Sequence, residues 1–156
     1  MIRVPGRPKS KLRSGCPVSR SLEILGDRWS LLVIRDLMIR GAKHFKDFQE
    51  SGEGIASNIL AGRLRKLQEA GIISAEPGET DGRRIDYRLT AKGIDLAPVL
   101  LELLLWGGQH EEDSMPRSMI EKMKHHREAI LAEVRRRWRE RNTTPLQSKT
   151  GEWHLP

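Results

Sequence analysis

The order of structural signals along residues 17–112 restricts this chain to few folds. Apolar residues recur at helical spacing in residues 17–25, 29–40, 44–50 and 56–70, and again from residue 90 onward. One pair of short strands interrupts the helices, at residues 72–75 and 84–89, with the turn signal Thr80-Asp81-Gly82 between them. The sequence therefore predicts a mainly α chain with one small β-hairpin, an α+β fold.

Residues that start and stop helices agree with the first boundaries. Pro17 suits the first helical position, where its missing N–H costs nothing. Gly26 ends that helix, and Asp27 stands where an N-cap is expected for the next one. Gly41 is the expected stop of the second helix, which is apolar nearly all round and is predicted to lie at the centre of the domain.

A known DNA-reading arrangement follows from the next three elements. The helices 44–50 and 56–70 are joined by the tight sequence Ser51-Gly52-Glu53-Gly54, and the hairpin comes directly after them. Two helices with a short glycine-containing turn, followed by a hairpin, make a winged helix-turn-helix. Because the major groove admits a single α-helix, the helix 56–70 is the expected recognition helix and the hairpin is the expected wing.

The outward face of the helix 56–70 supplies the first candidate DNA contacts. Its apolar stripe consists of Leu60, Leu64 and Leu67. At about 100° per residue, Asn58, Gly62 and Arg65 then point away from the core. Asn58 can bond adenine bidentately, and Arg65 can reach guanine or phosphate. Gly62 costs about 1 kcal/mol of helix stability relative to Ala, which close approach of DNA would explain; the alternative is that Gly62 arose by drift and that these polar residues merely face water.

Five further residues complete the predicted DNA-binding set. Ser57 lies at the entry of the recognition helix, and Lys46 lies on the short helix before it. Arg83 and Arg84 stand at the hairpin tip, where they can reach phosphate or a narrow minor groove, or simply face water. Arg63, at the edge of the apolar stripe, either bonds phosphate or pairs locally with Gln49, Glu50 or another acid; both alternatives stay open.

Charge and composition favour a polyanionic partner and argue against an enzyme. The 156 residues, enough for one domain, carry 28 Lys and Arg against 21 Asp and Glu, a net charge of +7. The five histidines are scattered, and neither a Gly-rich phosphate loop nor a nucleophile motif occurs, so we expect no catalytic residues, no metal and no cofactor. No segment predicts a signal peptide or a membrane span, and a cytoplasmic location is expected.

The ends of the chain divide into further predicted segments. Residues 1–15 form a flexible basic arm, either a disordered leader or an arm that contacts phosphate. Residues 16–112 hold the winged domain with its dimerisation helices, of which 90–112 is one long helix kinked at Pro98. Residues 113–141 hold a charged helix, whose arginines and interleaved glutamates favour local ion pairs in water, and residues 142–156 form a disordered tail.

Several motifs, in a fixed order, carry a resemblance to a known family. They are Cys16-Pro17-Val18, Leu25-Gly26-Asp27-Arg28-Trp29, Phe45-Lys46-Asp47-Phe48, Gly54-Ile55-Ala56-Ser57-Asn58, Arg63-Leu64-Arg65-Lys66-Leu67, Tyr87-Arg88-Leu89-Thr90-Ala91-Lys92-Gly93 and Trp106-Gly107. Over about residues 14–110 the chain resembles the HxlR family of bacterial transcriptional regulators. It departs from the family at Ala56, where a capping serine is common, and in its continuation over residues 111–156.

The resemblance implies a homodimer that binds double-stranded DNA at an inverted-repeat operator. The N-terminal helix and the long helix after the wing would form the dimer interface. The excess of apolar residues between Leu96 and Trp106 independently favours such a seam. The expected function is that of a sequence-specific transcriptional regulator, a repressor, whose effector is not predicted. The alternative is a module that binds protein or RNA through a winged-helix platform.

Cys16, the single cysteine, has two interpretations. It directly precedes a helix, so its thiol would face the positive end of the helix dipole, which favours the thiolate. Some members of the family sense oxidants or electrophiles through the cysteine at this position, which would here give an intersubunit disulfide or an adduct. The other interpretation is a small structural residue near the dimer seam.

Overall fold

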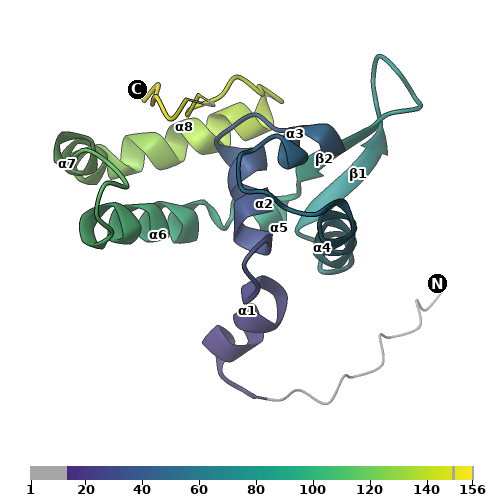
Figure 1. Cartoon of the computed structure of the whole chain (residues 1–156), viewed down its shortest axis with the longest axis horizontal. Helices are drawn as coiled ribbons and strands as arrows, with labels where there is room; N and C mark the ends of the chain where they lie inside the picture. The colour runs from purple at the N-terminus through teal and green to yellow at the C-terminus, as the bar shows by residue number, and fades with distance from the viewer. Residues whose placement is uncertain (1–13, 149, 156) are drawn as a thin grey trace, which may run out of the picture.

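The fold combines eight helices with one hairpin within residues 14–148 and 150–155, which the computed structural model describes (Figure 1). The elements are α1 (Pro17–Leu25), α2 (Ser30–Met38), α3 (Phe45–Gln49), α4 (Ser57–Glu69), β1 (Ile73–Pro77), β2 (Ile85–Leu89), α5 (Ala91–Ile94), α6 (Ala97–His110), α7 (Arg117–His125) and α8 (Arg127–Arg139). The predicted mainly α fold with a small hairpin is confirmed. No helix in these ranges has the length and apolar character needed to cross a bilayer. Residues 1–13 of the predicted basic arm lie outside the described ranges.

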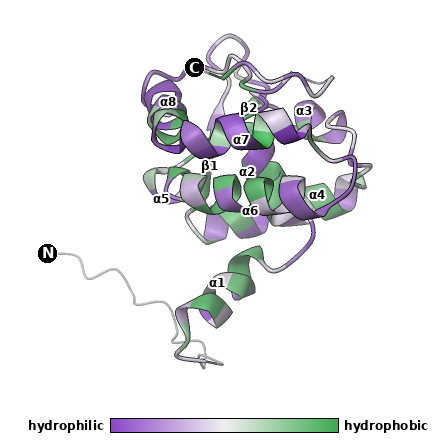
Figure 2. Ribbon diagram, turned by 90° about the vertical axis from the view of Figure 1, so that its left-hand side faces the viewer, coloured by the Kyte–Doolittle hydropathy of each residue, from purple (hydrophilic) through white to green (hydrophobic). Residues whose placement is uncertain are grey.

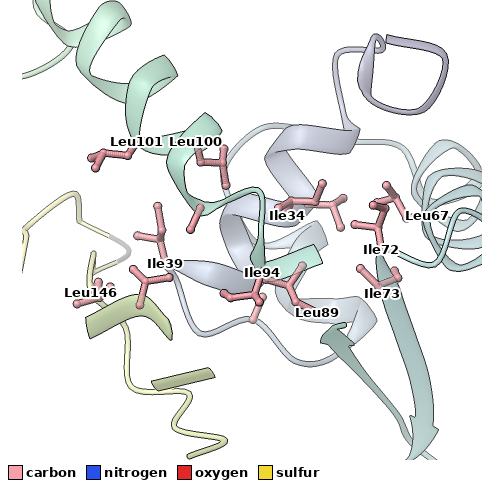
Figure 3. Packing of buried hydrophobic residues seen from close by; sticks show 14 of the residues in the cluster. Ile34, Ile39, Leu67, Ile72, Ile73, Leu89, Ile94, Leu100, Leu101 and Leu146 are labelled. Atoms are coloured by element: carbon pink, nitrogen blue, oxygen red, sulfur yellow. The ribbon is translucent and has the colours of Figure 1, made fainter. Parts of the chain in front are cut away.

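The core forms around α2. Ile34 of α2 is completely buried, and the predicted stripe of α4 turns inward, with Leu60, Leu64 and Leu67 at most 1% exposed. Figure 3 shows Ile34 facing Leu67 of α4 and Ile72 before β1, while further leucines and isoleucines close the other side. The helical periodicity of α2 and α4 therefore predicted which faces are buried.

The hairpin is antiparallel, with Ile73 opposite Leu89 and Pro77 opposite Ile85. Leu89 is buried, but Ile85 is 51% exposed, because it lies at the loop end of β2, beyond the edge of the core. The predicted apolar face of this strand thus ends at Tyr87, which is half-buried and meets Phe48 edge to face.

The long helix predicted for residues 90–112 is wrong, because the chain forms two helices there. The Thr90 hydroxyl accepts a hydrogen bond from the Gly93 N–H at 3.1 Å and so caps the short helix α5. A new helix, α6, begins at Ala97. Pro98 lies in the first turn of α6, where no backbone N–H is needed. Pro98 therefore helps to start a helix instead of kinking one.

The single charged helix predicted within residues 113–141 is also two helices, α7 and α8, separated at His126. The break lets the chain fold back, so that α8 runs alongside α6 (Figure 1). Ile120 and Met123 of α7, with Ile130 and Val134 of α8, bury their side chains in this arrangement. The predicted local ion pairs are present on the outer side of α8, where Arg136 bonds both Glu133 and Glu140.

The chain after α8 differs from the predicted disordered tail. Leu146 is 2% exposed, and its N–H donates to the carbonyl of Ile39 at 2.7 Å. The chain then reverses, so that His154 donates to the carbonyl of Leu146 at 2.7 Å. Trp153 packs half-buried against the core. A few apolar side chains, buried against distant parts of the chain, therefore order this segment.

The carboxylate of Asp27 ties the start of α2 to α4. It accepts hydrogen bonds from the backbone N–H groups of Trp29 and Ser30 at 2.8 and 2.9 Å, the bonds expected of the predicted cap. The guanidinium of Arg63 lies 3.2 Å away. Partial burial raises the pKa of Asp27, but the hydrogen bonds from Ser30 and Trp29 and the charge of Arg63 outweigh it, and the net pKa lies below the ordinary 3.8.

Replacement of Gly41 tests the contact between the tail and the end of α2. Gly41 has φ +70°, and an added Cβ would lie 2.1 Å from the carbonyl oxygen of Thr143. Gly71 has φ +73° with no atom within 4 Å of such a Cβ, which makes Gly71→Ala the matched control. We expect Gly71→Ala to cost about 1 kcal/mol and Gly41→Ala to cost clearly more, because the tail must also move. Urea unfolding measures both, and equal losses would contradict the contact.

Replacement of Asp27 by Asn tests the acid cap. Because the folded pKa is lowered, the carboxylate stabilises the fold above pH 3.8, and this contribution is lost as the pH falls through the folded value. We expect Asp27→Asn to lower the free energy of unfolding by roughly 1–3 kcal/mol at neutral pH. The difference from the wild type should shrink below pH 3.8. A difference independent of pH would show that the charge is not what stabilises this junction.

Candidate nucleic-acid interface

The turn between α3 and α4 is fixed by backbone geometry and by ion pairs. The carboxylate of Asp47 accepts the N–H groups of Lys43 and His44, both at 2.8 Å, and so starts α3. Gly52 and Gly54 both have positive φ, +89° and +72°, which other residues rarely adopt. The turn is therefore sharp enough to direct α4 away from α3 in the manner of a helix-turn-helix.

A buried carboxylate holds this turn against α2. Asp36, 3% exposed, accepts two hydrogen bonds from Arg35 at 2.8 and 2.9 Å, and Arg40 lies 3.6 Å away. Arg35 also bonds Glu53 in the turn at 2.8 Å, and Arg40 donates to the carbonyl of Ser51 at 3.1 Å. Burial raises the pKa of Asp36 more than the two arginines lower it. The network thus holds the turn that precedes α4 against α2.

The outward face of α4 carries free polar groups. Ser57, Asn58 and Arg65 are exposed, and the side chains of Asn58 and Arg65 have no polar partner in the described part of the chain. Gly62 is half-buried, yet an added Cβ would meet nothing within 4 Å, so the helix surface is open at this point. Asn58, Gly62 and Arg65 follow one another at helical spacing and therefore share one face.

Two of the predicted contact residues are engaged within the protein. The guanidinium of Arg63 pairs with Asp27, the acid at the start of α2, at 3.2 Å. The hydroxyl of Ser57 accepts a hydrogen bond from the Gln49 side chain at 2.6 Å and links α4 to α3. Since Ala56 has no polar side chain, it gives no cap to the first turn of α4.

The hairpin loop, residues 78–84, presents its two arginines to solvent. The Gly78 N–H donates to the Arg84 carbonyl at 2.7 Å, and the Asp81 carboxylate accepts the Arg83 N–H at 3.0 Å. These bonds use the backbone of the loop, while the side chains of Arg83 and Arg84 are exposed. Near the loop end of β2, Lys43 pairs with Asp86 at 2.8 Å, and the hydrogen bond from Lys43 holds the pKa of the Asp86 carboxyl below its usual value.

The sequence analysis missed two exposed residues on the same helix. Ile59 is 41% exposed and Lys66 is exposed, each next to the face of Asn58 and Arg65. An exposed isoleucine there can contact a thymine methyl group. The helical spacing that selected Asn58 could have found both.

Lys46 of α3 has a 77% exposed side chain and a loose pair with Glu50 at 3.5 Å. No three potential metal-ligating side chains gather in residues 14–148 and 150–155.

Comparisons with known proteins agree with this geometry. The chain is 35% identical over 112 residues to the HTH-type transcriptional regulator Mb3122 of Mycobacterium bovis, covering 72% of this chain and 68% of that one. The solved structure of PA1607, described as a candidate transcription factor, superimposes with a TM-score of 0.61 at 42% identity over 67% of this chain and 74% of PA1607. The redox regulator HypR in its oxidised form gives a TM-score of 0.56 at 30% identity, covering 62% of this chain and 99% of HypR.

A family model confirms the resemblance that the motifs carry. The model described as HxlR-like helix-turn-helix matches residues 24–115, which include α2 to α6 and the hairpin. The solved relatives show the winged-helix fold of transcription regulators. The chain belongs to the HxlR-like helix-turn-helix family of transcriptional regulators.

Proposed function

We propose that this regulator represses transcription by binding an inverted-repeat operator as a homodimer. The observation that carries the proposal is the free polar face of α4, where Asn58 and Arg65 are exposed beside the open surface at Gly62. A regulator that reads sequence needs such groups on a helix that the rest of the fold supports from behind. A dimer bound over a promoter excludes the polymerase, which is the simplest route to repression.

Each part of the interface has a distinct role in this proposal. The α4 face enters the major groove, where Asn58 and Arg65 bond base edges. The uncapped first turn of α4 leaves backbone N–H groups and the positive end of the helix dipole available to phosphate. Arg83 and Arg84 of the wing, with Lys46 of α3, contact the backbone on either side of the groove.

The exposed apolar surface supports dimerisation. Helix α1 buries none of its residues and projects from the body (Figure 1), with Val18 67% and Leu22 59% exposed. On α6, Leu103 and Trp106 are 46% and 60% exposed, and Figure 2 shows hydrophobic residues along parts of both helices. A second copy would cover this surface, and its two-fold symmetry would match an inverted repeat.

A redox or electrophile response through Cys16 is the second part of the proposal. Cys16 is exposed at the N-terminal end of α1, the helix that would lie at the dimer seam. The relative HypR is named a redox regulator. In an oxidising step, two Cys16 thiols of two protomers would lose two protons and two electrons to hydrogen peroxide, forming one disulfide and two waters.

Selection from random duplex DNA tests the regulator proposal. We expect a palindromic site with half-sites about one helical turn apart, and an affinity that falls steeply as salt rises. Asn58→Ala should weaken binding to that site by about 1–3 kcal/mol, roughly five- to 150-fold, without lowering stability. Gln68→Ala, which removes an exposed amide near the far end of α4, is the matched control.

Three outcomes separate the candidate functions. An enriched palindrome that Asn58→Ala abolishes supports a DNA regulator. Weak, unselective binding to DNA that is unchanged by Asn58→Ala rejects the regulator proposal. Retention of single-stranded RNA or of a protein partner, unaffected by Asn58→Ala, would instead favour the interaction module.

Oxidation of the purified protein tests Cys16. We expect hydrogen peroxide to change the affinity for the selected site at least severalfold, with a disulfide-linked dimer on a non-reducing gel, or an adduct when glutathione is present. Dithiothreitol should reverse the change, and Cys16→Ser should bind DNA normally but not respond. An equal response of the Ser variant would assign the effect to other residues, and no response of the wild type would leave Cys16 a structural residue.

A further inference from the structure

The chain after residue 115, which the family match does not include, reaches the DNA-reading elements at two places. This extension consists of α7, α8 and the following residues that pack on the core. One contact is with the base of the hairpin, and the other is with the helix-turn-helix turn.

The first contact joins the end of α8 to strand β2. The indole N–H of Trp138 donates to the carbonyl of Leu89 at 2.8 Å. Arg88 of β2 lies with its guanidinium carbon 5.3 Å from the centre of the Trp138 ring and donates to the Trp138 carbonyl. Just beyond the helix, Arg141 pairs with Glu79 in the hairpin loop at 3.3 Å. The end of α8 therefore touches the wing at its base and at its loop.

The second contact joins the tail to the turn between α3 and α4. The N–H groups of Leu146 and Gln147 both donate to the Ile39 carbonyl, at 2.7 and 3.2 Å. The Gln147 side chain accepts a hydrogen bond from Arg40 at 3.3 Å. Arg40 in turn donates to the carbonyl of Ser51 in the turn. The tail thus adds a partner to the network that positions the entry of α4.

The extension is itself firmly attached. Ile130 and Val134 of α8 are 6% exposed and pack into the core. On the same helix Glu133 bonds Arg136 and Arg137, which lower its pKa to about 2, and Arg137 also donates to the Thr144 carbonyl at 2.7 Å. The hairpin packs against α2 and α4 through its buried end, and the contacts with the anchored helix α8 add support to β2 and to the loop.

We propose that the C-terminal extension is a brace that sets the wing for DNA binding, with Trp138 as its positioning residue. The inference rests on the proposed function, since it concerns how well Arg83 and Arg84 are held for phosphate. Loss of the Trp138 contacts leaves Arg83 and Arg84 chemically unchanged but lets the hairpin that carries them move. DNA binding must then order the hairpin, and the free-energy cost of this ordering lowers the affinity for DNA.

A double-mutant cycle tests the brace in the full-length chain. Trp138→Phe keeps an aromatic ring and removes the indole N–H. We expect it to weaken binding to the selected DNA by about three- to tenfold, the equivalent of one hydrogen bond. In a chain that also carries Arg83→Ala and Arg84→Ala, Trp138→Phe should have no further effect, because the wing no longer contacts DNA. Additive effects would overturn the proposal, since they would show that Trp138 does not act through the wing.

Two further measurements separate positioning from general destabilisation. Amide hydrogen exchange without DNA should become faster in residues 76–87 of Trp138→Phe, while α4 and α6 stay protected. Arg135→Ala is the matched control, because Arg135 lies on the same helix but pairs with Asp95, at 3.2 Å, outside the wing. It should leave both the affinity and the exchange of the hairpin unchanged. Unchanged hairpin exchange in Trp138→Phe, or an equal loss of affinity in Arg135→Ala, would overturn the brace.

Failure of this inference can be told from failure of the proposed function. If the wild type selects no DNA site, the proposed function fails, and hydrogen exchange alone still reports whether Trp138 holds the hairpin. If the wild type selects a site that depends on Asn58, but Trp138→Phe binds it as tightly, the function stands and the brace does not.

Discussion

Burial of one short helix, α2, is the constraint on which the rest of the structure depends. Ile34 is completely buried, and α4, β2 and α6 all pack around this helix. The next residue but one, Asp36, is also buried, and its partners Arg35 and Arg40 reach into the turn that precedes α4. A helix with one apolar side against the core and one buried acid therefore fixes both the position and the entry of the recognition helix.

The net charge of +7 does not indicate where on the surface a polyanion would bind. Arginines that build the fold are matched by acids, as in the pairs of Arg35 with Asp36 and Arg63 with Asp27. On α8, the block of arginines is largely balanced by Glu133 and Glu140. Exposed cations remain on α4 and on the hairpin loop, so the distribution of charge over the surface carries more information than the net charge.

Local sequence patterns were sufficient to predict the helices and the hairpin of the winged domain. They did not predict how the helices after the hairpin and the tail pack against that domain. The leucine stripe of α4 follows from periodicity, and the positive φ of Gly41, three residues after α2 ends at Met38, follows from backbone freedom; both act within a few residues. The break before Ala97 and the break at His126 depend on what the following helix packs against. The partner of Arg63 lies 36 positions earlier, and Leu146 is buried by residues far away in sequence. No spacing rule reports such contacts, and the tail therefore looked like a polar, disordered segment.

The hydrogen bond from Arg40 to Gln147 spans 107 residues of the chain. During synthesis, the elements from α2 to the hairpin leave the ribosome well before the segment that crosses over Gly41. The network that holds the turn before α4 is therefore complete only once the tail has been made. The winged domain alone cannot supply the Gln147 end of this contact, so the turn depends on residues from two widely separated parts of the chain.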